Sequence, residues 1–251
     1  MVEAVISVAD LHKSYKKVRA VDGVSLEVRG GEAYGLLGPN GSGKSTTLHA
    51  LVGIIRPTGG RATISGFDSR SLEAKRLLGF VPDDLGMPET LSGWEFLDFV
   101  RSLYGVRDRS RAEVLTRVLG LEGALARLIE EYSHGMKKKL RVVAALLHGP
   151  LALVLDEPFG GLDPEAMINL KRLISSEKEK GTAVFVATHD LLTAEHYCDR
   201  IGILSEGALV AEGTTDQLFE RFGTDSLEEV FLKASRLLER SREVETYLQH
   251  L

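Results

Sequence analysis

The sequence has little of several features that define other protein classes. It contains a single cysteine, Cys198, so no intrachain disulfide can form, and this side chain is expected to be a small buried one in a reducing compartment. No apolar stretch approaches the ~18 uninterrupted residues of a transmembrane helix. The longest candidate, 142–155, is interrupted by His148, Gly149 and Pro150. The first residues lack a basic segment followed by an apolar run, so no secretory signal is expected.

Repeats and low-complexity segments are also missing, and basic residues are not in excess. The formal net charge of −5 argues against non-specific nucleic-acid binding, so no nucleic-acid partner is expected. With 251 residues, 43% of them hydrophobic and 27% charged, the chain is long enough to bury a full core in one or two lobes. These properties are typical of a globular protein.

One glycine-rich segment fits the phosphate-binding pattern G-x-x-x-x-G-K-[ST] at every position: Gly38, Pro39, Asn40, Gly41, Ser42, Gly43, Lys44, Ser45 and Thr46. Its glycines let backbone N–H groups approach phosphate oxygens closely, and Lys44 is expected to reach the β- and γ-phosphates during catalysis. Ser45 is expected to ligate Mg²⁺. A buried strand at 33–37 and a helix at 47–55 are predicted to flank the loop. All nine residues are therefore candidate nucleotide ligands.

A second candidate element begins with the apolar run 151–155, which predicts a parallel strand covered on both faces. The run ends in Asp156 and Glu157, and two carboxylates at the end of a buried strand are costly to desolvate without a compensating cation or proton. We expect Asp156 to bind Mg²⁺, directly or through water, and Glu157 to polarise the attacking water. The alternative is a pair of solvated loop acids, but the glycine-rich loop favours the catalytic interpretation.

Together these segments resemble the ATP-binding subunits of ABC transporters, and the resemblance extends from about residue 5 to residue 232. Further segments match that family in its order: Tyr15 at the position of an aromatic residue that stacks on adenine, 132–137 at the position of the L-S-G-G-Q signature, Gly161-Leu162-Asp163 after the catalytic glutamate, and the strand 184–188 followed by His189. This number of ordered motifs makes the resemblance highly specific.

The resemblance implies a role for each of these residues. Ser133 and the backbone of Gly135, at a helix N-terminus, would bind the γ-phosphate of ATP held by the opposite subunit. His189 would donate a hydrogen bond to the γ-phosphate, or orient water together with Glu157. Tyr15 would form the platform for adenine. Without these neighbours, His189 would be a satisfied histidine at a strand end and Tyr15 an ordinary half-buried aromatic.

Two departures from the family pattern concern the chemistry of the site. Asp83 stands where the family usually has a glutamine that ligates Mg²⁺ and reports the nucleotide state to the membrane subunit. Asp83 is expected to bind the metal itself or through water, with added negative charge, and the alternative is a solvated loop acid. In the signature, His134 and Met136 replace a glycine and a glutamine. This signature resembles the signatures found in the exporter-type branch of the family.

The expected fold class is α/β: a RecA-like P-loop NTPase core with an antiparallel β lobe and an inserted α-helical subdomain at about 87–140. The expected cassette covers 1–223, and 224–251 is expected to form an amphipathic helical tail. The local patterns that support these expectations are strand-like runs at 4–8, 24–28 and 61–64, capping boxes at Ser92–Glu95 and Ser110–Glu113, and a helix from Asp163 to about Lys180.

The tail has an apolar pattern that the nucleotide motifs do not explain. Its positions alternate by threes and fours with one polar interruption: Leu227, Val230, Ala234, Leu237, Ser241, Val244, Leu248 and Leu251. The favoured interpretation is an amphipathic helix that packs on its own domain, because about three heptads are marginal for an isolated coiled coil. The alternative is a contact that holds two subunits together between ATP cycles.

The sequence therefore predicts an ATP-hydrolysing subunit that dimerises around two Mg·ATP, with a second copy of itself or a paralogous subunit. Its expected partner is a separate integral-membrane permease, which would place the subunit in the cytoplasm, peripheral on the inner face of the cell membrane, and the expected direction of transport is export. The alternative from a different class is a soluble ABC-type ATPase that acts as an assembly or regulatory scaffold without a permease.

Overall fold

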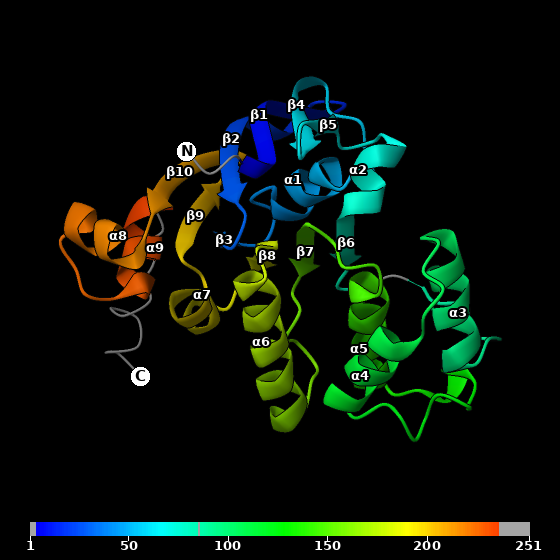
Figure 1. Cartoon of the computed structure of the whole chain (residues 1–251). Coiled ribbons are helices and arrows are strands. Elements are labelled where there is room, and N and C mark those ends of the chain that lie inside the picture. The colour runs from blue at the N-terminus through cyan, green and yellow to red at the C-terminus, as the bar shows by residue number, and fades with distance from the viewer. Residues whose placement is uncertain (1–3, 85, 236–251) are drawn as a thin grey trace.

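The computed structural model describes residues 4–84 and 86–235 and contains two β-sheets with helices around them (Figure 1). The strands are β1 (Ala4–Tyr15), β2 (Val18–Arg29), β3 (Ala33–Leu37), β4 (Gly59–Ile64), β5 (Phe67–Asp68), β6 (Leu78–Val81), β7 (Ala152–Asp156), β8 (Ala183–Thr188), β9 (Arg200–Ser205) and β10 (Ala208–Gly213). The helices are α1 (Lys44–Leu51), α2 (Leu72–Leu77), α3 (Gly93–Leu103), α4 (Ser110–Val118), the 3₁₀ turn η1 (Ile129–Glu131), α5 (His134–Leu146), α6 (Pro164–Glu179), α7 (Leu191–Tyr197), α8 (Thr215–Phe222) and α9 (Leu227–Ala234).

The larger sheet has six strands in the order β10-β9-β3-β8-β7-β6. All neighbouring pairs are parallel except β10 with β9, which forms an antiparallel edge. Strands β3 and β8 are buried along their whole length, as the apolar run at 33–37 predicted. Because the central strands are parallel, the loops that follow β3, β6, β7 and β8 all leave from the same edge of the sheet.

Helix α1 lies between the larger sheet and a four-stranded antiparallel sheet of order β2-β1-β4-β5. One apolar cluster joins the three layers, with Ile6 and Val28 from the smaller sheet, Leu48 from α1, and Leu36 and Phe185 from the larger sheet. This arrangement confirms the predicted α/β class and its antiparallel lobe, and strands β1 and β2 are longer than the sequence pattern indicated.

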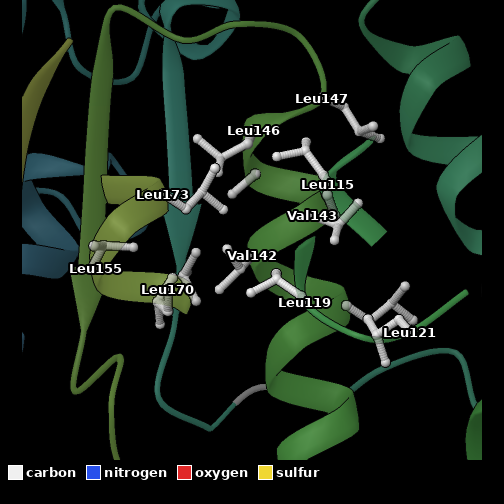
Figure 2. Packing of buried hydrophobic residues seen from close by; sticks show 14 of the residues in the cluster. Leu115, Leu119, Leu121, Val142, Val143, Leu146, Leu147, Leu155, Leu170 and Leu173 are labelled. Atoms are coloured by element: carbon white, nitrogen blue, oxygen red, sulfur yellow. The ribbon is translucent and has the colours of Figure 1, made fainter. Parts of the chain in front are cut away.

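The opposite face of the larger sheet is covered by α5 and α6, and α3 and α4 pack against α5 (Figure 1). Figure 2 shows the interior of this cluster, where Leu170 of α6 and Val142 of α5 lie between Leu155 of β7 and Leu115 of α4. Alternate residues of β7 therefore serve two cores, since Leu153 and Leu155 face this cluster and Val154 faces α1.

Helix ends test the local predictions. The Ser92–Glu95 capping box is present, and Asp163 caps α6 with Pro164 in the first turn. The box predicted at Ser110 is wrong: Arg109 occupies the N-cap position without a side-chain hydrogen bond, and Ser110 lies inside α4. The physical reason is that Asp108 accepts hydrogen bonds from both the backbone N–H and the hydroxyl of Ser110, which removes that hydroxyl from capping.

Two further boundaries differ from expectation or extend beyond what the structure describes. The helix predicted over 47–55 begins earlier and ends at Leu51, shortly before Gly53 adopts a φ of 68°. In the tail, Leu227 and Val230 of α9 are buried against α7, α8 and β9, as packing on the same domain requires. The remaining tail positions, from Leu237 to Leu251, lie outside the described residues. Among the helices that are described, none has the length and apolar character to cross a membrane.

Candidate nucleotide site

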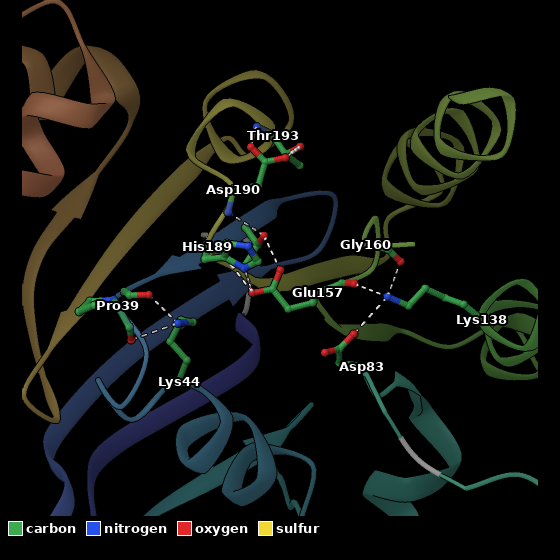
Figure 3. A network of polar contacts seen from close by, with 11 residues as sticks. Pro39, Lys44, Asp83, Lys138, Glu157, Gly160, His189, Asp190 and Thr193 are labelled. Atoms are coloured by element: carbon green, nitrogen blue, oxygen red, sulfur yellow. Dashed lines mark hydrogen bonds and ion pairs between the residues drawn. The ribbon is translucent and has the colours of Figure 1, made fainter. Parts of the chain in front are cut away.

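The candidate site lies where four loops leave the carboxyl edge of the larger sheet. The glycine-rich loop follows β3, Asp83 follows β6, Glu157 follows β7 and His189 follows β8. Figure 3 shows polar contacts that link Asp83, Glu157 and His189 at this edge, and Lys44 on the neighbouring glycine-rich loop. Residues that are far apart in sequence therefore meet because parallel strands place their ends together, which is the usual location of ligands in such sheets.

Backbone geometry explains the glycines of the loop. Gly41 and Gly43 have φ values of 83° and 103°, a region that side chains disfavour. A Cβ on Gly43 would lie 2.3 Å from the carbonyl oxygen of Ala20, and one on Gly38 would lie 2.4 Å from Ser42 Oγ. The loop is thus a tight cradle of backbone groups at the N-terminus of α1, the geometry that binds phosphate.

Lys44 places a cation at this cradle. Its Nζ donates to the carbonyl oxygens of Gly38 and Pro39 at 2.5 and 3.3 Å. Burial lowers the pKa of Lys44, although the nearby carboxylates of Glu157 and Asp156 act in the opposite direction. An anionic phosphate at the loop would be a better partner for the ammonium than these neutral carbonyl groups.

A cavity of about 320 Å³ opens beside the loop and is lined by its residues together with Tyr15 and Ala20. The Tyr15 side chain is 47% exposed, and Lys13 Nζ lies 4.9 Å from the centre of its ring. Tyr15 therefore lies on the wall of this cavity with a half-exposed ring that is able to stack on a planar ligand.

Glu157 is held by its backbone and by its carboxylate. Its φ of 43° lies in the left-handed region, and its N–H donates to the carbonyl oxygen of Ala187 at 2.9 Å. Thr188 Oγ1 donates to Oε2 at 2.9 Å, the backbone N–H of His189 donates to Oε1 at 2.9 Å, and Nδ1 of His189 lies 2.6 Å from the same oxygen. Such strained backbone persists where the surroundings over-determine it, as they do at many active sites.

Asp156 is positioned to attract a cation. Burial raises its pKa, and the carboxylates of Asp83 and Glu157 raise it further. The hydroxyl of Ser45 belongs to an exposed residue in the first turn of α1. One carboxylate, one hydroxyl and the oxygens of a bound phosphate form the kind of donor set that Mg²⁺ takes, since it is seldom held in an all-protein cage. These residues therefore fit Mg·ATP.

Asp83 already has a partner in the protein. Its Oδ1 lies 3.2 Å from Nζ of Lys138, whose side chain is fully buried, while Asp83 remains half-exposed. The same ammonium donates to the carbonyl oxygens of Glu157 at 2.7 Å and Gly160 at 2.9 Å (Figure 3). Asp83 therefore connects to the catalytic segment through a buried cation.

Ser133 and Gly135 lie elsewhere. Ser133 caps α5 and accepts a hydrogen bond from the N–H of Met136 at 3.3 Å. Because α1 and α5 pack on opposite faces of the larger sheet, neither residue lines the cavity of the glycine-rich loop. The first turn of α5 packs instead on the loop after Glu157, where a Cβ on Gly135 would lie 3.0 Å from the carbonyl oxygen of Gly161.

Comparison with known proteins agrees with this geometry. Residues 21–160 match the family model described as ABC transporter. The chain belongs to the ABC transporter family. Its ATP-binding domain has the RecA-like fold of ABC ATPase cassettes and carries their ATPase motifs.

Similar proteins span most of the chain. The linearmycin resistance ATP-binding protein LnrL of Bacillus subtilis is 34% identical, with 94% of this chain and 80% of the relative covered. An ABC transporter ATP-binding protein of Synechocystis is 37% identical over 87% of this chain, and the chain spans 62% of the length of that relative. A solved ATP-binding subunit of an ABC transporter superimposes with a TM-score of 0.86 at 33% identity, covering 92% of this chain and 99% of that one. A dimeric ABC cassette bound to ADP and phosphate gives a TM-score of 0.76 at 25% identity, covering 83% and 98%.

Sequence reasoning missed Lys138. The residue lies in a run of three lysines, a pattern that is typical of a solvated helix face. The overlooked signal is helical spacing: Lys138 lies four and seven residues before the buried Val142 and Ala145, on the apolar face of α5. A lysine at such a position needs polar partners inside the protein.

Proposed function

We propose that this chain is the ATP-hydrolysing subunit of an ABC exporter and that two copies enclose two Mg·ATP. The observation that carries this proposal is the placement of two half-sites on opposite faces of one sheet. The cradle leads into α1 on one face of the larger sheet, whereas Ser133 and Gly135 begin α5 on the other face. A phosphate bound in the cradle needs a helix N-terminus from another copy to complete its shell, and a dimeric neighbour of this fold supports that arrangement.

In this proposal the residues of the cradle edge have separate roles. Lys44 and the loop N–H groups bind the β- and γ-phosphates, and Tyr15 stacks on the adenine ring. Glu157 accepts a proton from the attacking water, and His189 orients that water or donates to the γ-phosphate. Ser45, Asp156 and Asp83 would hold Mg²⁺, directly or through water. Bound Mg²⁺ would supply neutralisation of the charge that develops on the phosphate oxygens.

The permease partner is proposed to dock in an apolar groove of about 390 Å³ between β6, α3 and α5. Its lining includes the exposed Ile54 and Leu103, Phe80 and Pro82 next to Asp83 in the chain, and Lys75, whose ammonium donates to the carbonyl oxygen of Val52. An amphipathic cytoplasmic helix of the permease that carries an acidic residue matches this chemistry. The groove is continuous with the Asp83 segment, so a helix seated there would sense changes at the nucleotide site. The similarity to the linearmycin resistance protein LnrL supports export of a drug-like cargo.

The catalytic part of the proposal is tested by Glu157→Gln, which keeps the shape of the side chain and removes the base. Turnover is expected to fall by at least ~10²-fold, because a positioned general base contributes that much, while ATP affinity is retained. The variant should also accumulate an ATP-dependent dimer in size-exclusion chromatography. Lys44→Ala is the matched contrast, since it should weaken nucleotide binding itself. Normal turnover of Glu157→Gln would remove Glu157 from the mechanism.

A further inference from the structure

The buried ammonium of Lys138 contacts the loop that begins at Glu157, yet Lys138 belongs to none of the nucleotide-binding motifs. It has three oxygen partners: Oδ1 of Asp83 at 3.2 Å, the carbonyl of Glu157 at 2.7 Å and the carbonyl of Gly160 at 2.9 Å. Three donors on one ammonium match three acceptors, so the cation is fully satisfied despite zero exposure of its side chain. A lysine is seldom buried so completely, and its partners here all belong to loops of the candidate site.

The contact with Glu157 concerns the strained residue of the site. Glu157 adopts a left-handed φ of 43°, which costs conformational free energy for a residue with a side chain. Its N–H, its carboxylate and its carbonyl oxygen are all engaged, and Lys138 is the partner of the carbonyl. The ammonium therefore helps to maintain the backbone conformation that directs the carboxylate toward Thr188 and His189.

Lys138 also connects this segment to α5. It lies one turn after Ser133 and Gly135, and the first turn of α5 abuts the same loop, since a Cβ on Gly161 would lie 2.9 Å from the His134 ring. Any shift of α5 along the loop must therefore move the ammonium relative to the carbonyl oxygens of Glu157 and Gly160. The charge of Asp83, which replaces the family's neutral glutamine, is balanced by this cation.

We propose that Lys138 is a positioning residue: it fixes the backbone of Glu157 and of the loop at Gly160 relative to α5, and it transmits movement of the Ser133 end of α5 to the general base. This inference deepens the proposed function, because it rests on Glu157 acting as the base. In the proposed dimer, the position of Glu157 beside the cradle of one chain would then depend on whether Ser133 of the same chain has bound the nucleotide of the partner copy.

The first test measures the loop directly, without turnover. In the nucleotide-free protein, Lys138→Met should increase amide hydrogen exchange in residues 157–163, since the segment loses its buried anchor. Arg111→Met is a matched control, because Arg111 also joins a carbonyl and a buried carboxylate, Leu146 O at 2.7 Å and Glu177 Oε2 at 2.8 Å, away from the site. The control should leave exchange in 157–163 unchanged. Unchanged exchange in Lys138→Met would overturn the proposal.

The second test is a double-mutant cycle in single-turnover hydrolysis. Lys138→Met should lower the rate by roughly 10-fold or more, since small displacements of catalytic groups are costly, and leave the Kd for Mg²⁺-free ATP within about 2-fold. In the Glu157→Gln background the same change should have no further effect, because the base that it positions is gone. Equal falls in both backgrounds, or a matching loss of nucleotide affinity, would contradict a positioning role. Lys138→Gln, which keeps a donor, serves if the methionine variant does not fold.

The two proposals fail in different ways. If Glu157→Gln turns over normally, the assignment of the base is wrong, whatever Lys138 does. If Glu157→Gln is inactive but Lys138→Met exchanges and hydrolyses like the wild type, the base stands and Lys138 is only a buried ion pair.

Discussion

At the scale of single residues, the site brings three carboxylates together, and Lys138 pairs with one of them, Asp83. Burial raises the pKa of Asp156, and the neighbouring carboxylates of Asp83 and Glu157 raise it further. Lys138 is engaged by Asp83, and Lys44 donates to loop carbonyl oxygens. The site is thus arranged for a ligand that adds positive charge, as Mg²⁺ would.

This leads to a pH-dependent prediction for Asp156→Asn in the absence of nucleotide. A carboxyl whose pKa is raised in the folded state destabilises the fold once it ionises, so its penalty is absent below 3.8 and develops as pH rises through the raised pKa. The asparagine variant should therefore have a higher Tm than the wild type at pH 7, and the difference should disappear near pH 3.5. Thermal unfolding across that range is the measurement.

The same variant supplies an internal control. Added Mg²⁺ and ATP should stabilise the wild type more than Asp156→Asn, because a carboxylate ligand has been lost. Equal stabilisation of the two proteins by Mg·ATP would show that Asp156 does not serve the metal.

Residue identities in the site were predictable from sequence to the extent that a motif fixes backbone geometry. The glycine-rich loop could be predicted, because glycine is the residue that readily adopts φ values such as that of Gly43. The contacts of Lys138 could not be predicted, because they depend on which face of α5 meets the loop after β7. Three consecutive lysines do not show which of them lies on that face. The ion pair between Asp83 and Lys138 likewise needs the structure, since 54 residues separate the two positions along the chain.

At the scale of elements, strands and helices with strong apolar patterns were predicted well, and their ends less so. The run at 33–37 became β3 because both of its faces are covered. The capping box predicted at Ser110 does not form because the Ser110 hydroxyl donates to Asp108 instead. Residue spacing alone does not reveal this contact. The groove between β6, α3 and α5 could not be predicted at all, since it forms where three separate segments meet.

The groove gives a prediction at this scale. Ile54→Glu and Leu103→Glu place charges on side chains that are 56% and 68% exposed, so the fold and basal ATP hydrolysis should be retained. Binding to membranes that contain the cognate permease should fall by roughly 10-fold or more, because a buried unpaired carboxylate in an interface is costly. Leu192→Glu, at a side chain that is 70% exposed on α7, is the control and should bind normally. Co-sedimentation with such membranes measures the effect, and equal binding by all three variants would place the permease elsewhere.

At the scale of the whole molecule, the chain offers two incomplete half-sites that a second copy would complete. The family resemblance implied this arrangement, but only the structure shows that α1, which follows the cradle, and α5 pack on opposite faces of the larger sheet. In the proposed twofold dimer, the cradle of each copy would face the α5 of the other, and each site would take residues from both chains. This arrangement can be tested by mixing variants that are defective in different half-sites.

Lys44→Ala damages the cradle, and Ser133→Asp damages the opposite half-site by repelling the γ-phosphate, although aspartate still caps α5. Each variant alone should hydrolyse ATP at least ~10²-fold more slowly than the wild type, since each loses a phosphate contact at both sites. A 1:1 mixture should recover up to about a quarter of wild-type activity, because half of the dimers are mixed and each mixed dimer has one intact site. Steady-state ATPase assays of the mixture measure this recovery. If the site belonged to one chain alone, mixing would restore nothing, and the dimeric proposal would have to be abandoned.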